Sequence, residues 1–132
     1  MREILFRGKS THNGEWIEGY FGIKGESASR EKTYCIMQST LSNNCETTYF
    51  TDYEVSPETV GQYTGFTDKN GKKVFEGDIL KNACGGIRVV VFMNSRFILK
   101  NINNNQCSSW AYMDKHEIVG NIHDNPELLK GE

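Results

Sequence analysis

Short runs of β-prone residues separated by turn-forming residues constrain the fold of this chain more than any other feature. Glycine occurs 13 times and proline twice among the 132 residues, and Asn, Asp and Ser cluster between the apolar runs. This pattern is typical of antiparallel meanders, barrels and sandwiches. The sequence therefore predicts a mostly β fold, built as a bent antiparallel sheet or a partly closed barrel.

Two turn sequences predict β-hairpins. The segment 11–14, Thr-His-Asn-Gly, joins strand candidates at residues 3–8 and 15–23, and Asn70-Gly71 lies between two further β-prone runs. Asn and Gly tolerate the positive φ that tight hairpin turns require. Other strands are expected at residues 33–38, 87–93, 97–99 and 117–122, and loops at 39–48 and 101–109. Asn94-Ser95-Arg96 bridges the runs 87–93 and 97–99, which predicts a third hairpin. A short helical turn is expected over residues 125–129, with Asn125 as its cap and Pro126 at its first position.

Glu76 and Asp78 are two residues apart and would share one face of a strand, as a paired acid–base or metal site needs. The glycine between them favours a bulge at the start of a returning strand, with the Asp78 carboxylate bonded to nearby backbone N–H groups. The bulge is therefore the preferred interpretation. The residues assigned to turns and bulges are Gly65, Asn70, Gly71, Gly77 and Asp78.

The length of 132 residues suits one hydrophobic core, so residues 1–132 are expected to form a single domain. No apolar run approaches the roughly 18 residues that span a bilayer, and the N-terminus lacks the apolar stretch of a signal peptide. A cytoplasmic protein without membrane contact is expected. The four cysteines are scattered, which favours free thiols over two disulfides; they are Cys35, Cys45, Cys84 and Cys107.

The 15 basic and 17 acidic side chains give a net charge of −2, so no global positive field attracts nucleic acid. A local basic cluster beside aromatic residues leaves nucleic-acid binding as an alternative, although Asp68, Glu76 and Asp78 dilute its charge. The candidate nucleic-acid contacts are Lys69, Lys72, Lys73 and Lys81.

A catalytic or metal site finds little support. His116 and His123 would lie about 23 Å apart along an extended strand, at about 3.3 Å per residue, so they cannot share an ion without a sharp turn. No Gly-x-Ser-x-Gly elbow and no phosphate-binding glycine loop occurs. We therefore assign no catalytic residues, cofactor or metal, and a metal-dependent enzyme is the least favoured function.

Protein binding is the favoured function. A small β protein with unpaired strand edges and abundant aromatic residues can add a strand or dock aromatic side chains against a partner. The candidate contact residues are Trp16, Trp110 and Tyr112, with core burial as the alternative for each. The same features allow a homo-oligomer in place of a foreign partner.

Three groups of motifs resemble one known family. The N-terminal group is Arg2-Glu3-Ile4, Arg7-Gly8 and Gly14-Glu15-Trp16; the central group is 57–65, 68–72 and 75–79; the C-terminal group is 117–122 and 124–129. Together they resemble the YopX family of small proteins carried by bacteriophages and prophages. The resemblance implies a mostly β fold and a phage or prophage accessory protein in a bacterial host cell. It supplies no catalytic residues.

Overall fold

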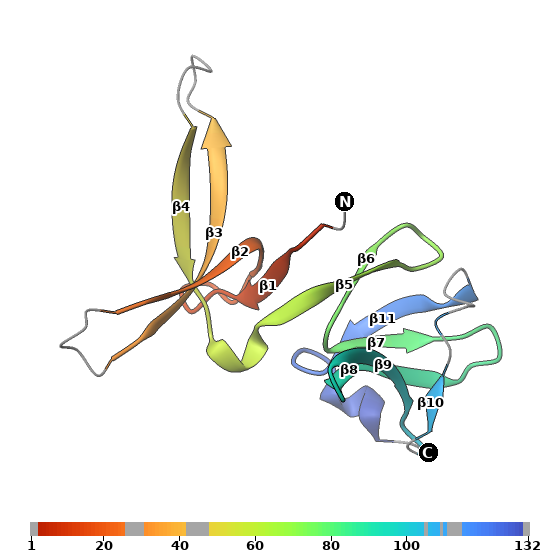
Figure 1. Cartoon of the computed structure of the whole chain (residues 1–132). Coiled ribbons are helices and arrows are strands. Elements are labelled where there is room, and N and C mark those ends of the chain that lie inside the picture. Colours follow the sequence, from red (N-terminus) through yellow and green to blue (C-terminus); the bar gives the residue numbers. More distant parts are fainter. Residues whose placement is uncertain are drawn as a thin grey trace. The chain divides into compact units, whose positions relative to one another are not determined.

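The computed structural model describes residues 3–25, 31–41, 48–104, 106–108, 110 and 115–130, and they are mostly β (Figure 1). The chain divides into two compact units, an N-terminal unit Glu3–Gln62 and a C-terminal unit Tyr63–Glu132. All described strand pairs are antiparallel, and neither sheet closes on itself within the described residues. The mostly β prediction is confirmed in its open-sheet form, and a single domain over residues 1–132 stays a prediction.

The N-terminal unit is an antiparallel meander in the order β4-β3-β2-β1, with the first residues of β5 beside β1. The predicted hairpin at residues 11–14 joins β1 and β2; the N–H of Gly14 donates to the carbonyl oxygen of Ser10 at 3.0 Å. The strands are β1 (Phe6–Lys9), β2 (Trp16–Lys24), β3 (Thr33–Leu41), β4 (Thr48–Glu54) and β5 (Gly61–Thr67), and the 3₁₀ turn η1 (Pro57–Thr59) precedes β5.

The core of this unit is small. Cys35, Ile36 and Val55 are buried, and Gly19 allows β2 and β3 to approach closely. A Cβ atom at Gly19 would lie only 2.2 Å from the carbonyl oxygen of Met37. Close backbone approach is one of the few situations that require glycine inside a strand.

The predicted loop over residues 39–48 is wrong at both ends. β3 continues to Leu41 and β4 begins at Thr48, with Ser39 opposite Phe50 in the register. Polar residues in this stretch suggested a loop, but cross-strand pairing keeps them extended. Residues 42–47 lie outside the described part of the chain.

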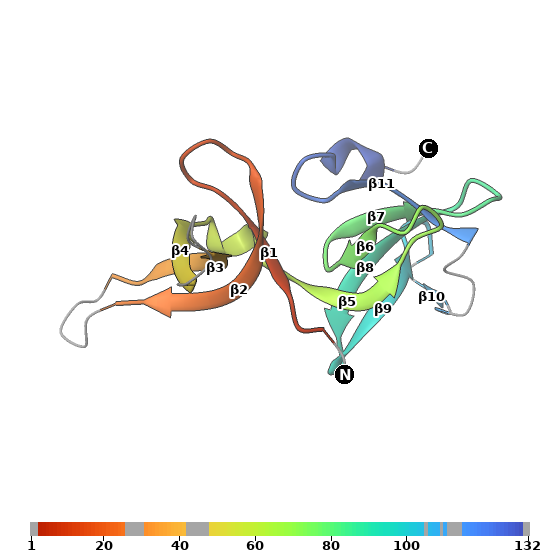
Figure 2. The same cartoon turned by 90° about the horizontal axis from the view of Figure 1, so that it is seen from above.

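The C-terminal unit contains a five-stranded sheet in the order β10-β9-β8-β7-β11, and Figure 2 shows β7, β8 and β9 side by side. β6 instead pairs with the later residues of β5, through Tyr63 opposite Phe75 and Thr67 opposite Lys73. The strands are β6 (Lys73–Phe75), β7 (Asp78–Lys81), β8 (Ile87–Met93), β9 (Arg96–Asn101), β10 (Cys107–Ser108) and β11 (Glu117–Asn121).

The core of the C-terminal unit follows from strand alternation. Val90 lies opposite Leu99, so both side chains point to the same face of the sheet. They pack with Val74 and Leu80, and Trp110 and Ile118 cover the cluster. Burying each large apolar side chain contributes about 1.5–3 kcal/mol.

The hairpin predicted at residues 94–96 joins β8 and β9 through Asn94 and Ser95, whose φ angles are 54° and 64°. Both angles lie in the left-handed region, as in a type I′ hairpin turn. The predicted loop over 101–109 is wrong in part, because β9 reaches Asn101 and Cys107–Ser108 form β10 against it.

The predicted C-terminal turn is the 3₁₀ helix η3 (Pro126–Leu129). Asn125 precedes it but makes no side-chain cap bond to it, which corrects the predicted cap. Its Oδ1 atom instead accepts a hydrogen bond from the N–H of Asn121 at 3.3 Å. The side-chain oxygen of Asn125, which the sequence predicted to cap the helix, thus bonds to the last residue of β11.

Candidate functional site

Asp68 organises the turn between β5 and β6. It is 5% exposed, and its Oδ1 atom accepts hydrogen bonds from the N–H groups of Asn70 and Lys72, each at 2.9 Å. Its Oδ2 atom accepts from the N–H of Ile118 at 3.1 Å. Burial alone would raise the pKa of Asp68, but these N–H donors and the Lys72 charge hold it below its ordinary value. The sequence interpretation treated this residue only as a diluting charge.

The predicted turn residues have a positive φ or bond to the backbone. Gly65, Gly71 and Gly77 have φ angles of 92°, 80° and 92°, in the region that favours glycine. Asp78 is 2% exposed, and its Oδ2 atom accepts a hydrogen bond from the N–H of Phe75 at 2.7 Å. The Asp78 carboxylate is thus bonded to a backbone N–H group, as the sequence predicted.

The four predicted basic contacts lie near acidic or aromatic groups. Lys69 Nζ lies 3.5 Å from Glu117 Oε2, and Lys73 Nζ lies 5.7 Å from the ring centroid of Tyr63. Lys81 stands opposite Glu117 in the β7–β11 register, and Lys72 lies close enough to Asp68 to lower its pKa. Nearby carboxylates reduce the positive field that a phosphate backbone would meet.

The predicted aromatic contacts have different environments. Trp110 stacks on Phe66 with ring centroids 4.4 Å apart, and its indole N–H donates to the carbonyl oxygen of Phe97 at 3.0 Å. Trp16 is half-buried on β2, with the Arg7 guanidinium 4.7 Å from its ring centroid. Trp110 therefore serves the core, while Trp16 remains partly accessible. Tyr112 lies outside the described residues.

The described residues hold no group of three or more His, Cys, Asp or Glu side chains placed to bind a metal ion. His116 is buried before β11, and His123 follows that strand. Cys35, Cys84 and Cys107 are free thiols, and Cys45 lies outside the described part. No helix in the described ranges has the length and apolar character to cross a membrane.

One face of the N-terminal unit carries an exposed apolar cluster that the sequence interpretation missed. The register places Tyr20 opposite Met37 and Ser39 opposite Phe50, so strand alternation brings all four side chains to one face. We call these four residues the hairpin face. Tyr20 is 56% and Phe50 is 62% exposed, and the four side chains line a hollow of about 520 Å³.

The hairpin face adjoins an open sheet edge. β4 is the terminal strand in the described strand order, and β3 is its described partner. Figure 1 shows β3 and β4 side by side as an antiparallel pair. A terminal strand presents a row of N–H and C=O groups away from its neighbour. The alternation Trp16, Glu18, Tyr20 within β2 is the sequence signal for this face, but Phe50 joins it only through the register with β3.

Comparison with known proteins places this fold in a family. The model of the YopX protein family matches residues 5–130. The crystal structure of protein EF1440 from Enterococcus faecalis is similar, with a TM-score of 0.59 and 26% sequence identity, over 98% of this chain and 100% of that chain. No curated protein matches. The family match spans nearly the whole sequence, and this chain therefore belongs to the YopX family.

Proposed function

We propose that this chain is a phage or prophage accessory protein that acts in the bacterial cytoplasm by binding another protein. The family membership supports the mobile-element origin. The observation that carries the binding function is the exposure of Tyr20 and Phe50 beside the open edge of β4. The partner is a protein with an extended segment bearing apolar side chains.

The edge of β4 supplies the backbone part of this recognition. An extended segment can pair with a terminal strand through main-chain hydrogen bonds, which give affinity with little dependence on sequence. In β4 the aromatic Tyr49 and Phe50 lie at one end and the acidic Asp52 and Glu54 at the other. The carboxylate of Asp52 is already paired with Lys24.

The hairpin face supplies the side-chain part. A partner residue in the hollow would contact the rings of Tyr20 and Phe50 and the thioether of Met37. Aromatic and methionine side chains are enriched at the centres of protein interfaces because they bury large areas with few rotatable bonds or adapt to the partner's shape. An aliphatic or aromatic side chain suits this hollow.

The test is affinity capture of the tagged protein from bacterial lysate, with and without nuclease, read by mass spectrometry. Three baits are compared: the wild-type chain, Phe50→Asp and Phe92→Asp. Phe92 is a matched control because it is 54% exposed but lies on β8 of the C-terminal unit. We expect one discrete protein to be retained after nuclease by the wild-type chain and Phe92→Asp, and lost with Phe50→Asp.

Equal retention by Phe50→Asp would reject the hairpin face as the contact surface. Retention that disappears with nuclease would reject the protein-binding function and favour nucleic acid, which salt must then weaken. Elution from a sizing column tests the remaining outcome, which is self-association of this chain. If the wild-type chain alone elutes as a dimer and Phe50→Asp as a monomer, the face joins two copies of this chain instead.

A further inference from the structure

Arg88 occupies a core-facing position in the C-terminal sheet. It stands opposite Leu80 on β7 and Asn101 on β9, two residues before the buried Val90. Side chains two apart in a strand share a face, so Arg88 points to the same side as the core cluster. A charged side chain in such a position requires polar partners or a charged ligand.

The structure holds this guanidinium in place from two sides. Its Nε–H donates to Ser108 Oγ at 2.6 Å, and Nη1 donates to the carbonyl oxygen of Ile87 at 3.2 Å. A Cβ atom at Gly86 would lie 2.9 Å from Arg88 Nη1, so the glycine makes room for it. A guanidinium carries five N–H donors, and among the described residues these two acceptors are its partners.

The loop before β8 adds further donors. Asn82 Oδ1 accepts hydrogen bonds from the N–H groups of Cys84 at 3.0 Å and Gly86 at 2.7 Å. The oxygen of this amide is thus used within the loop, while its Nδ2 group is a donor that lies close to Arg88 across Gly86. Asn82 Nδ2 and Arg88 Nη1 therefore both lie within 3.1 Å of the point that a Cβ atom at Gly86 would occupy.

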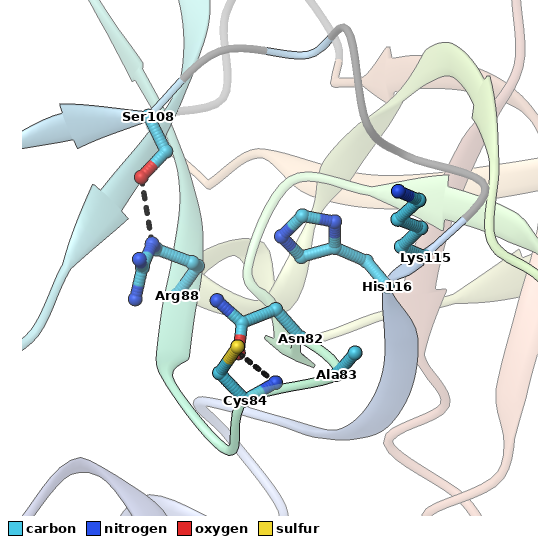
Figure 3. A pocket seen from close by; sticks show the side chains of 7 residues that line it. All are labelled: Asn82, Ala83, Cys84, Arg88, Ser108, Lys115 and His116. Atoms are coloured by element: carbon cyan, nitrogen blue, oxygen red, sulfur yellow. Dashed lines mark hydrogen bonds between the residues drawn. The ribbon is translucent and has the colours of Figure 1, made fainter.

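These groups line a pocket of about 410 Å³ (Figure 3). In Figure 3 the His116 ring and the Arg88 side chain lie on opposite sides of the space, with Asn82 and Cys84 between them. No Asp or Glu of the described residues lines it. The described lining residues are Asn82, Ala83, Cys84, Arg88, Ser108, Lys115 and His116.

We propose that this pocket binds a small organic molecule through an oxyanion, either a phosphate or a carboxylate. The planar guanidinium can donate two parallel hydrogen bonds to such a group, and these charge-assisted bonds are about twice as strong as neutral ones. The volume lies within the range of roughly 300–1,000 Å³ found for small-molecule sites, which exceeds the need of a bare ion. The proposal is independent of protein binding because all these residues belong to the C-terminal unit.

The test is an NMR titration of the full ¹⁵N-labelled chain at constant ionic strength. Phenyl phosphate and benzoate are the two oxyanion probes, and neutral benzamide is the control for contacts made by the ring alone. We expect saturable shifts of the Cys84 and Gly86 amides and of the Arg88 Nε–H with at least one oxyanion. The tighter of the two identifies the anion source, and benzamide leaves these signals unchanged.

Variants of the same chain keep the proposal falsifiable. Arg88→Gln should weaken the binding of the oxyanion about tenfold or more, because a charged hydrogen-bond donor is lost. Gly86→Ala keeps the charge, but its Cβ atom would lie too close to Arg88 Nη1, so this variant should also bind the oxyanion more weakly. Arg96→Gln is the matched control, since Arg96 is exposed at the other end of β8–β9. No saturable shift with either oxyanion, equal shifts with benzamide, or unchanged affinity in Arg88→Gln with a wild-type-like spectrum would each overturn the proposal.

Discussion

At the scale of single residues, Asp68 shows how a turn acquires a buried charge. Its carboxylate accepts from three backbone N–H groups, two within its own turn and one from Ile118 on β11. Fifty residues of sequence separate Asp68 from Ile118. The bonds compensate for burial, which is why the pKa of Asp68 lies below its ordinary value.

Replacing Asp68 with Asn should lower the free energy of unfolding by about 1–3 kcal/mol, because one accepting oxygen becomes an NH₂ group, which faces a backbone N–H and cannot accept its hydrogen bond. The depressed pKa of Asp68 also sets the sign of its pH dependence. Its stabilisation is fully present above the unfolded-state value near pH 4 and is lost as the pH falls through the lower folded-state pKa. Chemical denaturation from pH 7 to pH 2 measures both effects.

Glu15→Gln is the matched control for this experiment because Glu15 is exposed in the β1–β2 connection. It should leave the free energy of unfolding at pH 7 within about 0.5 kcal/mol of the wild-type value. If Asp68→Asn loses stability with acid as steeply as the wild-type chain, the assigned pKa direction is wrong.

At the scale of elements, the contact of β2 with β3 depends on glycine at one position. A Cβ atom at Gly19 would meet the Met37 carbonyl oxygen at 2.2 Å, whereas one at Gly22 would meet the flexible Met37 methyl group at 3.0 Å. The first contact is with backbone, which can move only if the strands separate. The second is with the end of a side chain that adapts by rotation.

Gly19→Ala should therefore destabilise the chain by at least about 1–3 kcal/mol, while Gly22→Ala should cost about 1 kcal/mol or less. Neither glycine has a positive φ, so backbone strain does not separate the two variants. Thermal unfolding followed by far-ultraviolet circular dichroism measures the difference. Equal melting temperatures for the two variants would contradict the close approach of β2 and β3 at Gly19.

At the scale of the whole molecule, β5 links the two units within one strand. Its first residues pair with β1 and its later residues pair with β6. A continuous strand gives a physical reason to expect a single domain, because the β5 residues that pair with β1 run directly into the residues that pair with β6. Each unit also contains one described tryptophan, Trp16 or Trp110, which can report its unfolding.

We expect each tryptophan to unfold together with the whole chain. Trp110→Phe leaves Trp16 as reporter of the N-terminal unit, and Trp16→Phe leaves Trp110 as reporter of the C-terminal unit. In each variant, the fluorescence and circular dichroism transitions in urea should coincide, as two-state unfolding requires. A fluorescence midpoint that departs from the circular dichroism midpoint in either variant would indicate two independently folding domains.

Local sequence patterns determined much of this fold. The Asn-Gly and Asn-Ser turns, the β-prone runs and the Pro126 helix start depend on backbone preferences of a few neighbouring residues, so the mostly β class and three hairpins followed from the sequence. The motif resemblance predicted membership of the YopX family, and the family match over residues 5–130 confirmed it. The polar stretches 39–41 and 107–108 were misjudged because strand pairing, rather than their own propensity, keeps them extended.

Only the tertiary structure decided which side chains meet. Phe50 joins Tyr20 through the β3 register, and Arg88 donates a hydrogen bond to Ser108 and lines one pocket with His116, although these residues lie far apart in sequence. The sequence does contain a signal for Arg88. It lies two residues before the apolar Val90 in a strand, so both side chains are expected on the same, core-facing side of the sheet. Whether such a charge is paired, bonded or exposed depends on residues brought close by folding, and the spacing within one strand carries no information about them.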